Sequence, residues 1–363
     1  MTALIFIAVL FVLILVHEWG HYITAKKTGM RVDEFGIGFP PKVWSVKKGE
    51  TEYSLNSLPI GGFVRIYGED PTQVTDDPDR DRAFAARPRW AQAVVLVAGV
   101  VMNIALAWVL FAAVFMLGVP SAVDEADAGP DAELRIIQIL PESPLANELP
   151  ANATITGVST DTAELSALTP SALTQFVAEA GDEAITITYQ LGGTEEETVT
   201  VTPTTGLIED DPERAAIGVS SALIEEQRHS FGEAIVGATV QTWDALRLIV
   251  VSIAGLLYST VAGTADFSQV AGPVGIFNLV GDAASIGLTS LLMFTAIISL
   301  NLAIINLFPI PALDGGRLVF VAIESITRRP IDPVWTSRLN LIGFLLLIAL
   351  MIAVTYKDIL DLL

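Results

Sequence analysis

Four long apolar runs dominate the pattern of hydrophobic and polar positions along the chain. Each holds about 20 residues, which is enough for a helix that crosses a bilayer. We therefore predict an α-helical membrane protein with four transmembrane helices, at residues 3–24, 92–118, 287–308 and 339–356. The first run has no basic start and no small-residue cleavage site, so we expect it to be retained rather than removed as a signal peptide.

A further helical segment, residues 232–262, is apolar on one side only. It is interrupted by three charged residues, Glu233, Asp244 and Arg247, a pattern typical of a helix that lies in the membrane interface. The number of crossings favours the same interpretation. If this segment does not cross, the end of the 287–308 helix reaches the same membrane face as the end of the first helix. Residues 230–285 are thus predicted to be an amphipathic interfacial helix and a loop.

Between the first two spans, residues 31–66 alternate between apolar and polar positions as strands do. Lys48-Gly49-Glu50 is a turn signal within this stretch, so a β-hairpin is predicted directly after the first helix. Breaks rich in glycine and proline at 36–40 and 59–62 predict loops that dip into the membrane beside a wet cavity. The hairpin is therefore expected to be membrane-associated, and residues 69–82 to be a solvated loop.

Residues 131–220 have the mixed pattern of an α+β module. Strands are predicted at 134–139 and 153–158, a helix at 170–180, and a hairpin of 184–190 and 197–203 around Gly192-Gly193. This order fits one inserted PDZ-like domain, which would bind extended peptides by strand addition. An unrelated small α+β cap is the alternative.

The predicted organisation has four parts. Transmembrane helices 1–2 and the hairpin occupy 1–119, the PDZ-like domain 130–222, the interfacial helix and loop 230–285, and transmembrane helices 3–4 occupy 286–363.

Charge and composition add an orientation and exclude one class of partner. Residues 25–91 hold 11 Lys and Arg against 10 acids, whereas residues 120–230 hold 21 acids and three bases. Because basic residues concentrate on the cytoplasmic side, we expect a multi-pass protein of the cell (inner or plasma) membrane with its N-terminus and PDZ-like domain outside. A mean hydropathy of +0.56 makes the lipid bilayer its surroundings, and a net charge of −21 argues against nucleic-acid binding.

The candidate chemistry lies in His17-Glu18-Trp19-Gly20-His21, near the end of the first span. Two histidines four residues apart share one helix face and suit two ligands of a tetrahedral Zn²⁺. Glu18 lies about 100° further round the helix, where it can reach a metal-bound water without being a ligand. Ionisable residues within a span indicate a function. With no cysteine in the chain, any further zinc ligand must be His, Asp or Glu. His229 is expected to be a surface residue.

Asp314 is the predicted third ligand. It follows the 287–308 span in the segment Asn306-x-x-Pro309-x-Pro311-x-Leu313-Asp314-Gly315-Gly316, where prolines end the helix and irregular backbone can present an acid at membrane depth. A carboxylate beside two imidazoles completes a three-ligand site with an open fourth position. The alternatives for Asp314 are an interfacial helix-end acid or a partner for Arg317. Asn103, in the second span, is expected to serve interhelical hydrogen bonding or the site.

Together these motifs resemble the site-2 protease family of zinc intramembrane metalloproteases, in particular its RseP-type members with a PDZ domain between the second and third spans. The resemblance runs nearly end to end. Besides the two motifs above, it rests on Gly61-Gly62-Phe63-Val64 and Gly272-Pro273-Val274-Gly275-Ile276.

The resemblance implies a zinc-dependent endopeptidase that acts in regulated intramembrane proteolysis, with its active site near the cytoplasmic face. Its zinc ligands would be His17, His21 and Asp314, and its base Glu18. Asn306 would help hold substrate or the oxyanion. Beyond the resemblance, we expect the 42–66 hairpin, with Gly61, Gly62 and Phe63, to bind the unwound substrate by strand addition. Substrates would be single-span membrane proteins such as anti-sigma factors and remnant signal peptides. The PDZ-like domain would contact a peptide or exclude uncut substrates.

Two departures from the family pattern stand out. Val100 follows Gly99 where the family usually has proline, and Glu148-Leu149-Pro150-Ala151 replaces a glycine-rich continuation in the PDZ-like domain. The second departure weakens the expectation that this domain captures a C-terminal carboxylate.

Two other functions compete with proteolysis. A non-catalytic PDZ-bearing membrane scaffold would have no need of the Glu18 carboxylate. A zinc transporter would need polar residues spread across the membrane depth, whereas here they gather at one face.

Overall fold

The computed structural model describes residues 1–69, 78–146, 148–191, 195–207, 211, 214–264 and 271–360. Within them the chain divides into two units. The membrane unit comprises residues 1–113, 233–284 and 290–363, and the inserted unit comprises residues 114–232 and 285–289.

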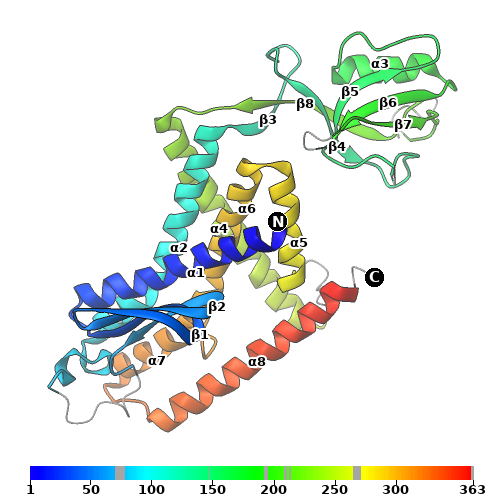
Figure 1. The fold of residues 1–363 in the computed structure, drawn as a ribbon. Coiled ribbons are helices and arrows are strands. Elements are labelled where there is room, and N and C mark those ends of the chain that lie inside the picture. Colours follow the sequence, from blue (N-terminus) through cyan, green and yellow to red (C-terminus); the bar gives the residue numbers. More distant parts are fainter. Residues whose placement is uncertain are drawn as a thin grey trace. The chain divides into compact units, whose positions relative to one another are not determined.

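Five helices of the described chain are long and apolar enough to cross a membrane, judged by length and composition. They are α1 (Thr2–Lys27), α2 (Arg89–Leu117), α4 (Phe231–Ala262), α6 (Leu288–Leu307) and α8 (Pro333–Leu360) (Figure 1). The four predicted spans coincide with α1, α2, α6 and α8. The chain is therefore a helical multi-pass membrane protein that also carries β-sheets.

The structure offers one more candidate span than the four predicted, because α4 also meets the criteria of length and composition; whether it crosses or lies in the interface stays a prediction. This helix has 32 residues, which is about 48 Å at 1.5 Å per residue and more than a bilayer core requires. Its three charged residues lie between Glu233 and Arg247, and the stretch from Leu248 to Ala262 carries no charge.

The predicted loop after α4 is wrong in part, because residues 273–286 form helix α5 (Pro273–Ile286). The Phe277 ring of α5 lies 5.4 Å from the Phe6 ring of α1. With 14 residues, this short helix is not among the described helices that are long enough to cross a membrane.

The Gly-Pro-Val-Gly-Ile motif forms the start of α5 and receives a cap from α8. The backbone N–H groups of Gly272 and Gly275 donate to the Asp358 carboxylate at 3.1 and 2.8 Å. A Cβ at Gly272 would lie 2.7 Å from that carboxylate, so glycine permits the close approach. A carboxylate at a helix N-terminus also interacts favourably with the positive end of the helix dipole.

β1 (Val32–Lys48) and β2 (Thr51–Ile66) form the predicted antiparallel hairpin. Each strand bends and pairs twice, so the segments run across the sheet in the order 42–48, 51–56, 32–37 and 62–66. The loops predicted at 36–40 and 59–62 are bends inside these strands. Among the described residues, 62–66 pairs with 32–37 alone and forms one edge of the sheet. We call this segment the edge strand.

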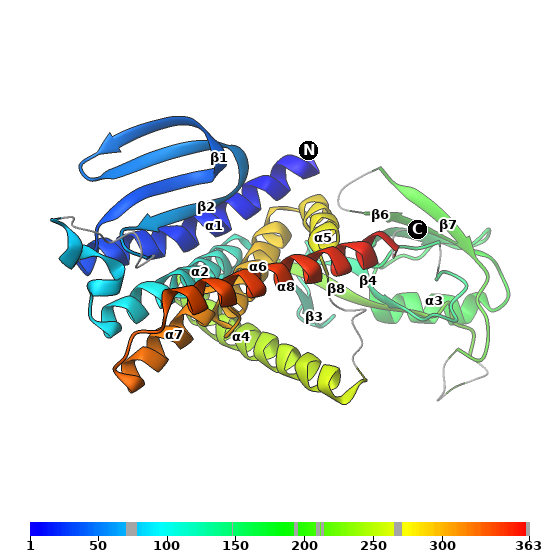
Figure 2. The same cartoon turned by 90° about the horizontal axis from the view of Figure 1, so that it is seen from below.

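The hairpin lies beside α1 (Figure 2). The Phe35 ring contacts Trp19 and Tyr22 of α1, with centroids 5.9 and 5.4 Å apart. At the hairpin turn, Glu50 pairs with Lys26 at the end of α1 and with Arg82, and the hydrogen bond from Arg82 lowers the pKa of Glu50 to about 2. These contacts hold the sheet against the helix that carries the two histidines. The predicted loop at 69–82 lies partly outside the described residues, and its end forms the short 3-10 helix η2 (Arg80–Arg82), followed by η3 (Phe84–Ala86).

The inserted unit contains a six-stranded antiparallel sheet and one helix. The strands are ordered β3 (Val119–Val123), β8 (Val219–Gln227), β4 (Glu133–Ile139), β5 (Thr154–Ser159), β6 (Ile185–Gln190) and β7 (Glu197–Val201). Helix α3 (Pro170–Ala180) buries Leu173 and Val177 in a core shared with Ile155 and Ile187. It starts after Thr169, whose hydroxyl accepts the N–H of Ala172, and ends at Gly181, with φ +59°.

The predicted strands and helix of this unit are present, while β3 and β8 are not predicted by the sequence. β8 reads Val-Ser-Ser-Ala-Leu-Ile-Glu-Glu-Gln, which lacks the alternation that identifies a strand. The turn expected at Gly192-Gly193 lies outside the described residues.

Candidate metal centre

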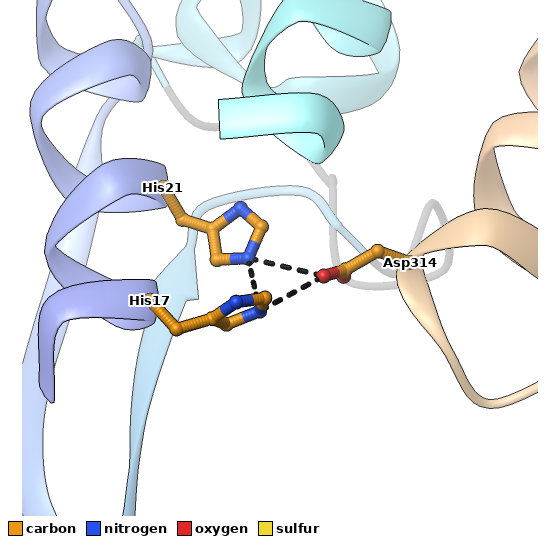
Figure 3. A group of neighbouring side chains, drawn as sticks. All are labelled: His17, His21 and Asp314. Atoms are coloured by element: carbon orange, nitrogen blue, oxygen red, sulfur yellow. Dashed lines mark hydrogen bonds and ion pairs between the residues drawn. The ribbon is translucent and has the colours of Figure 1, made fainter. Parts of the chain in front are cut away.

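His17, His21 and Asp314 come together although Asp314 lies far from the histidines in the sequence (Figure 3). The His17 Nε2 and His21 Nε2 atoms lie 3.0 and 3.2 Å from the same Asp314 oxygen, and 3.1 Å from each other. Ligand atoms around a tetrahedral zinc are about 3.3 Å apart. The three side chains therefore fit a zinc ion with little movement.

A second observation favours zinc at this site. The Nδ1 atom of His21 lies 2.8 Å from the carbonyl oxygen of Val95 in α2. Nδ1 therefore carries the proton and donates a hydrogen bond to the Val95 carbonyl oxygen, which leaves the lone pair of Nε2 directed at the site. A ligating histidine usually has such a hydrogen bond on its other nitrogen.

Glycine in α2 makes room for the two imidazoles. A Cβ at Gly99 would lie 2.5 Å from His21 Nε2 and 2.6 Å from His17 Cε1. Gly20 of α1 lets the backbones of α1 and α2 approach each other closely. A Cβ at Gly20 would lie 2.6 Å from the Ala98 carbonyl oxygen of α2. The role of Gly99 was not predicted. Its signal was a glycine in the middle of an apolar span, where no turn needs one.

Asp314 is the first residue of α7 (Asp314–Thr327), after a tight loop. A Cβ at Gly315 would lie 2.2 Å from the Leu307 carbonyl oxygen, and one at Gly316 2.2 Å from that of Ile310. The two glycines after Asp314 thus let α7 start directly against the end of α6. The loop is also tied to α8, since Ala312 N–H donates to the Asn340 side chain at 3.2 Å.

Arg317 is not the partner of Asp314. Its guanidinium pairs with Glu69 at 2.5 Å and lies over the Phe84 ring. This pair connects α7 to the end of the edge strand.

The edge strand lies beside Glu18. A Cβ at Gly62 would lie 3.7 Å from Glu18 Cγ, and the Val64 backbone N–H is directed at the Glu18 carboxylate. The edge strand therefore lies against the face of α1 that carries Glu18, the predicted base.

The other predicted substrate residues lie in different settings. Gly61 has φ +111° and its position is covered by the Phe39 ring, while the Phe63 ring packs over Gly36. Asn306 is half-buried near the end of α6, and its amide has no hydrogen bond to another described residue. His229, in the inserted unit, is partly buried against the Phe115 ring.

Comparison with known proteins identifies the family. The chain matches peptidase family M50 over residues 5–350. It belongs to this family. M50 comprises the site-2 proteases, so the chain is a zinc metalloprotease of the membrane.

Individual relatives align with this sequence along nearly the whole chain. A Clostridium perfringens protein named as a candidate zinc metalloprotease is 34% identical over 96% of this chain and 95% of its own length. The zinc metalloprotease RasP of Oceanobacillus iheyensis is 29% identical over 99% and 98%. The regulator of sigma-W protease RasP of Bacillus subtilis is 27% identical over 99% and 98%.

The geometry predicts a specific effect of filling the Gly99 position. In Gly99→Ala the new methyl group would occupy the space of both imidazoles, so we expect zinc content after dialysis to fall at least about tenfold. The matched control is Gly255→Ala in α4, where a Cβ meets nothing within 4 Å. Zinc is measured by mass spectrometry on monodisperse detergent-solubilised protein. Equal zinc in the Gly99→Ala and Gly255→Ala variants would contradict the packing described here.

Proposed function

We propose that this membrane metalloprotease is an endopeptidase that cuts single-span membrane proteins within or near the bilayer. In this proposal His17, His21 and Asp314 hold the zinc and Glu18 is the general base. The observation that carries the proposal is the position of the metal-binding group. Both histidines belong to a long apolar helix of a multi-pass protein, so a substrate must reach them at membrane depth.

The chemistry assigns distinct roles to the residues of the site. A zinc ion held by the three ligands would polarise the scissile carbonyl and lower the pKa of a coordinated water towards 7. Glu18 takes a proton from the attacking water and delivers it to the leaving amine. Asn306 binds a backbone group of the substrate beside the scissile bond.

A transmembrane substrate must also lose its helical structure before it can be cut, because its carbonyls are bonded within the helix. The edge strand offers replacement hydrogen bonds. Among the described residues it pairs on one side only, and its Gly62 lies against Glu18. We propose that the unwound substrate adds to Gly62–Ile66 as a further strand, with the scissile bond opposite Glu18.

The inserted unit supports a second contact with extended peptide, as a PDZ-like domain would make. β3 pairs with β8 only at Leu223–Gln227, which leaves the edge of Val219–Ala222 without a strand partner on that side in the described chain. Beside it lies a groove of about 220 Å³, bordered by Leu173, Thr174 and Val177 of α3 and by the start of β8. A strand edge next to a groove provides the main-chain bonds and the side-chain pocket of strand addition.

The proposed orientation follows the charge distribution. The basic segment 25–91 and the metal centre would lie near the cytoplasmic face of the cell membrane, with the N-terminus and the inserted unit outside. The Bacillus subtilis relative is named a regulator of sigma-W protease. That name supports substrates of the anti-sigma-factor class, with remnant signal peptides as a second class of single-span substrate.

Catalysis can be separated from metal binding at Glu18. In Glu18→Gln we expect cleavage of a co-expressed single-span substrate to fall at least about 100-fold, because general-base catalysis contributes this much, while zinc content stays at one ion. The control is Glu142→Gln on the exposed surface of the inserted unit. Equal cleavage by Glu18→Gln and wild type would refute a protease that uses Glu18. A zinc-free wild type would refute the ligand assignment.

Strand addition can be tested by cross-linking, because the chain has no cysteine. Arg65→Cys, combined with Glu18→Gln to trap the substrate, is tested against a series of single-cysteine substrates. We expect disulfides with every second substrate position, the period of a strand. The control is Val43→Cys, which is similarly exposed but lies near the opposite edge of the sheet. A period of three to four residues, or equal cross-linking from Val43→Cys, would reject strand addition at Gly62–Ile66.

The groove of the inserted unit is tested with tryptophan. Thr174→Trp should fill the groove and raise the KM for a substrate that retains an extended outer segment, with little change for one that lacks it. Gln175→Trp is the matched control, because Gln175 is exposed on the same helix and does not border the groove. Identical kinetics of the two variants on both substrates would remove the groove from the proposal.

A further inference from the structure

Asn103 is a buried polar residue of α2, and its sequence context leaves its role open between helix packing and the site. Asn103 lies on α2 one turn after Gly99 and is completely buried. Its amide Nδ2 lies 3.3 Å from Nδ1 of His17. Its Oδ1 atom is buried without a hydrogen-bond partner in the described chain. One end of the buried amide is thus without a partner in either orientation, so the contact with His17 decides which way the amide is turned.

The orientation conflicts with the proposed role of His17. An amide N–H that donates to Nδ1 requires a lone pair on Nδ1, and the single proton of a neutral imidazole must then sit on Nε2. Yet Nε2 is the atom that faces Asp314 and His21. A protonated Nε2 has no lone pair for a metal ion.

A half-turn of the amide removes the conflict. The N and O atoms of an asparagine amide have nearly the same shape, and their assignment follows from the hydrogen-bond network. After the turn, Oδ1 faces His17 and accepts a hydrogen bond from Nδ1–H, which leaves the lone pair of Nε2 directed at the site. This is the arrangement that the Val95 carbonyl gives His21.

We propose that Asn103 is a positioning residue that fixes the ligating tautomer of His17 by accepting its Nδ1–H. Three residues at intervals of four along α2 then serve the two histidines of α1. Val95 orients His21, Gly99 leaves space for both rings, and Asn103 orients His17. The backbone carbonyl of Asn103 also accepts a hydrogen bond from the Ser299 hydroxyl of α6 at 2.8 Å. This bond fixes the position of α2 along α6, the helix that precedes Asp314.

This inference rests on the proposed ligand role of His17, and two substitutions test the direction of its hydrogen bond. Asn103→Asp keeps an acceptor of the same shape and removes the donor, whereas Asn103→Leu keeps the volume and removes both. If the Asn103 oxygen accepts from His17, the Asp variant retains zinc in competition with a chelator. The Leu variant loses about ten- to 100-fold in zinc affinity, as is usual for a lost outer partner of a ligating histidine.

A spectroscopic measurement separates this role from a packing defect. Cobalt-substituted wild type and Asn103→Asp should share one visible absorption spectrum, and Asn103→Leu should show a changed or weaker one. Ser299→Ala removes the contact to the Asn103 backbone but keeps the amide, and we expect it to bind zinc like wild type. Helix content and monodispersity are compared in all variants.

The outcomes distinguish the two proposals. Equal loss of zinc in the Asp and Leu variants would mean that an acceptor at this position does not preserve the site, and wild-type zinc affinity in the Leu variant would mean that Asn103 has no positioning role. Either result overturns the inference while the Glu18 experiment can still support the protease. Zinc-free wild-type protein overturns the ligand assignment itself.

Discussion

The close crossing of α1 and α2 is the constraint on which the metal centre depends. Gly20 lets the two backbones approach and Gly99 leaves the space in which two imidazoles fit. A side chain at either position would collide with the opposite helix or with the imidazoles, which would disturb the contacts between α2 and the histidines. A histidine pair on an isolated membrane helix would turn its rings into lipid. The second helix therefore turns a short motif into an oriented pair of ligands.

The sheet and α7 complete the surroundings of that pair through polar contacts. Glu50 connects the hairpin turn to the end of α1 and to Arg82, and Arg317 connects α7 to Glu69 beyond the edge strand. The edge strand, Glu18 and the metal-binding group are thus held together by α1, the hairpin and α7. A peptide on the free strand edge would meet the site at a distance fixed by the protein, which is the main requirement for positioning a scissile bond.

The residues with distinctive chemistry were predictable from the sequence. A histidine pair at helical spacing and an acid between prolines and glycines are unusual in apolar runs, and the structure brings these three side chains within ligand distance of one another. The five-helix architecture was less predictable. The charges of α4 all lie before Leu248, which a periodicity average does not reveal, and α5 is too short to stand out as a span. The bends of β1 and β2 resembled loops, because glycine and proline mark both. The function of Gly99 could not be predicted, since it depends on what the opposite helix presents.

The proposed ligands also lie at opposite ends of the chain, 297 residues apart between His17 and Asp314. Because a metal site that is shared between distant segments forms only when both have assembled, metal affinity becomes part of the folding free energy. During synthesis, the first helix would enter the membrane long before α7 exists. The nascent protein would then carry two of three ligands and no competent centre. A protease that cuts membrane segments would thus stay harmless among other newly inserted helices until its own last third had folded.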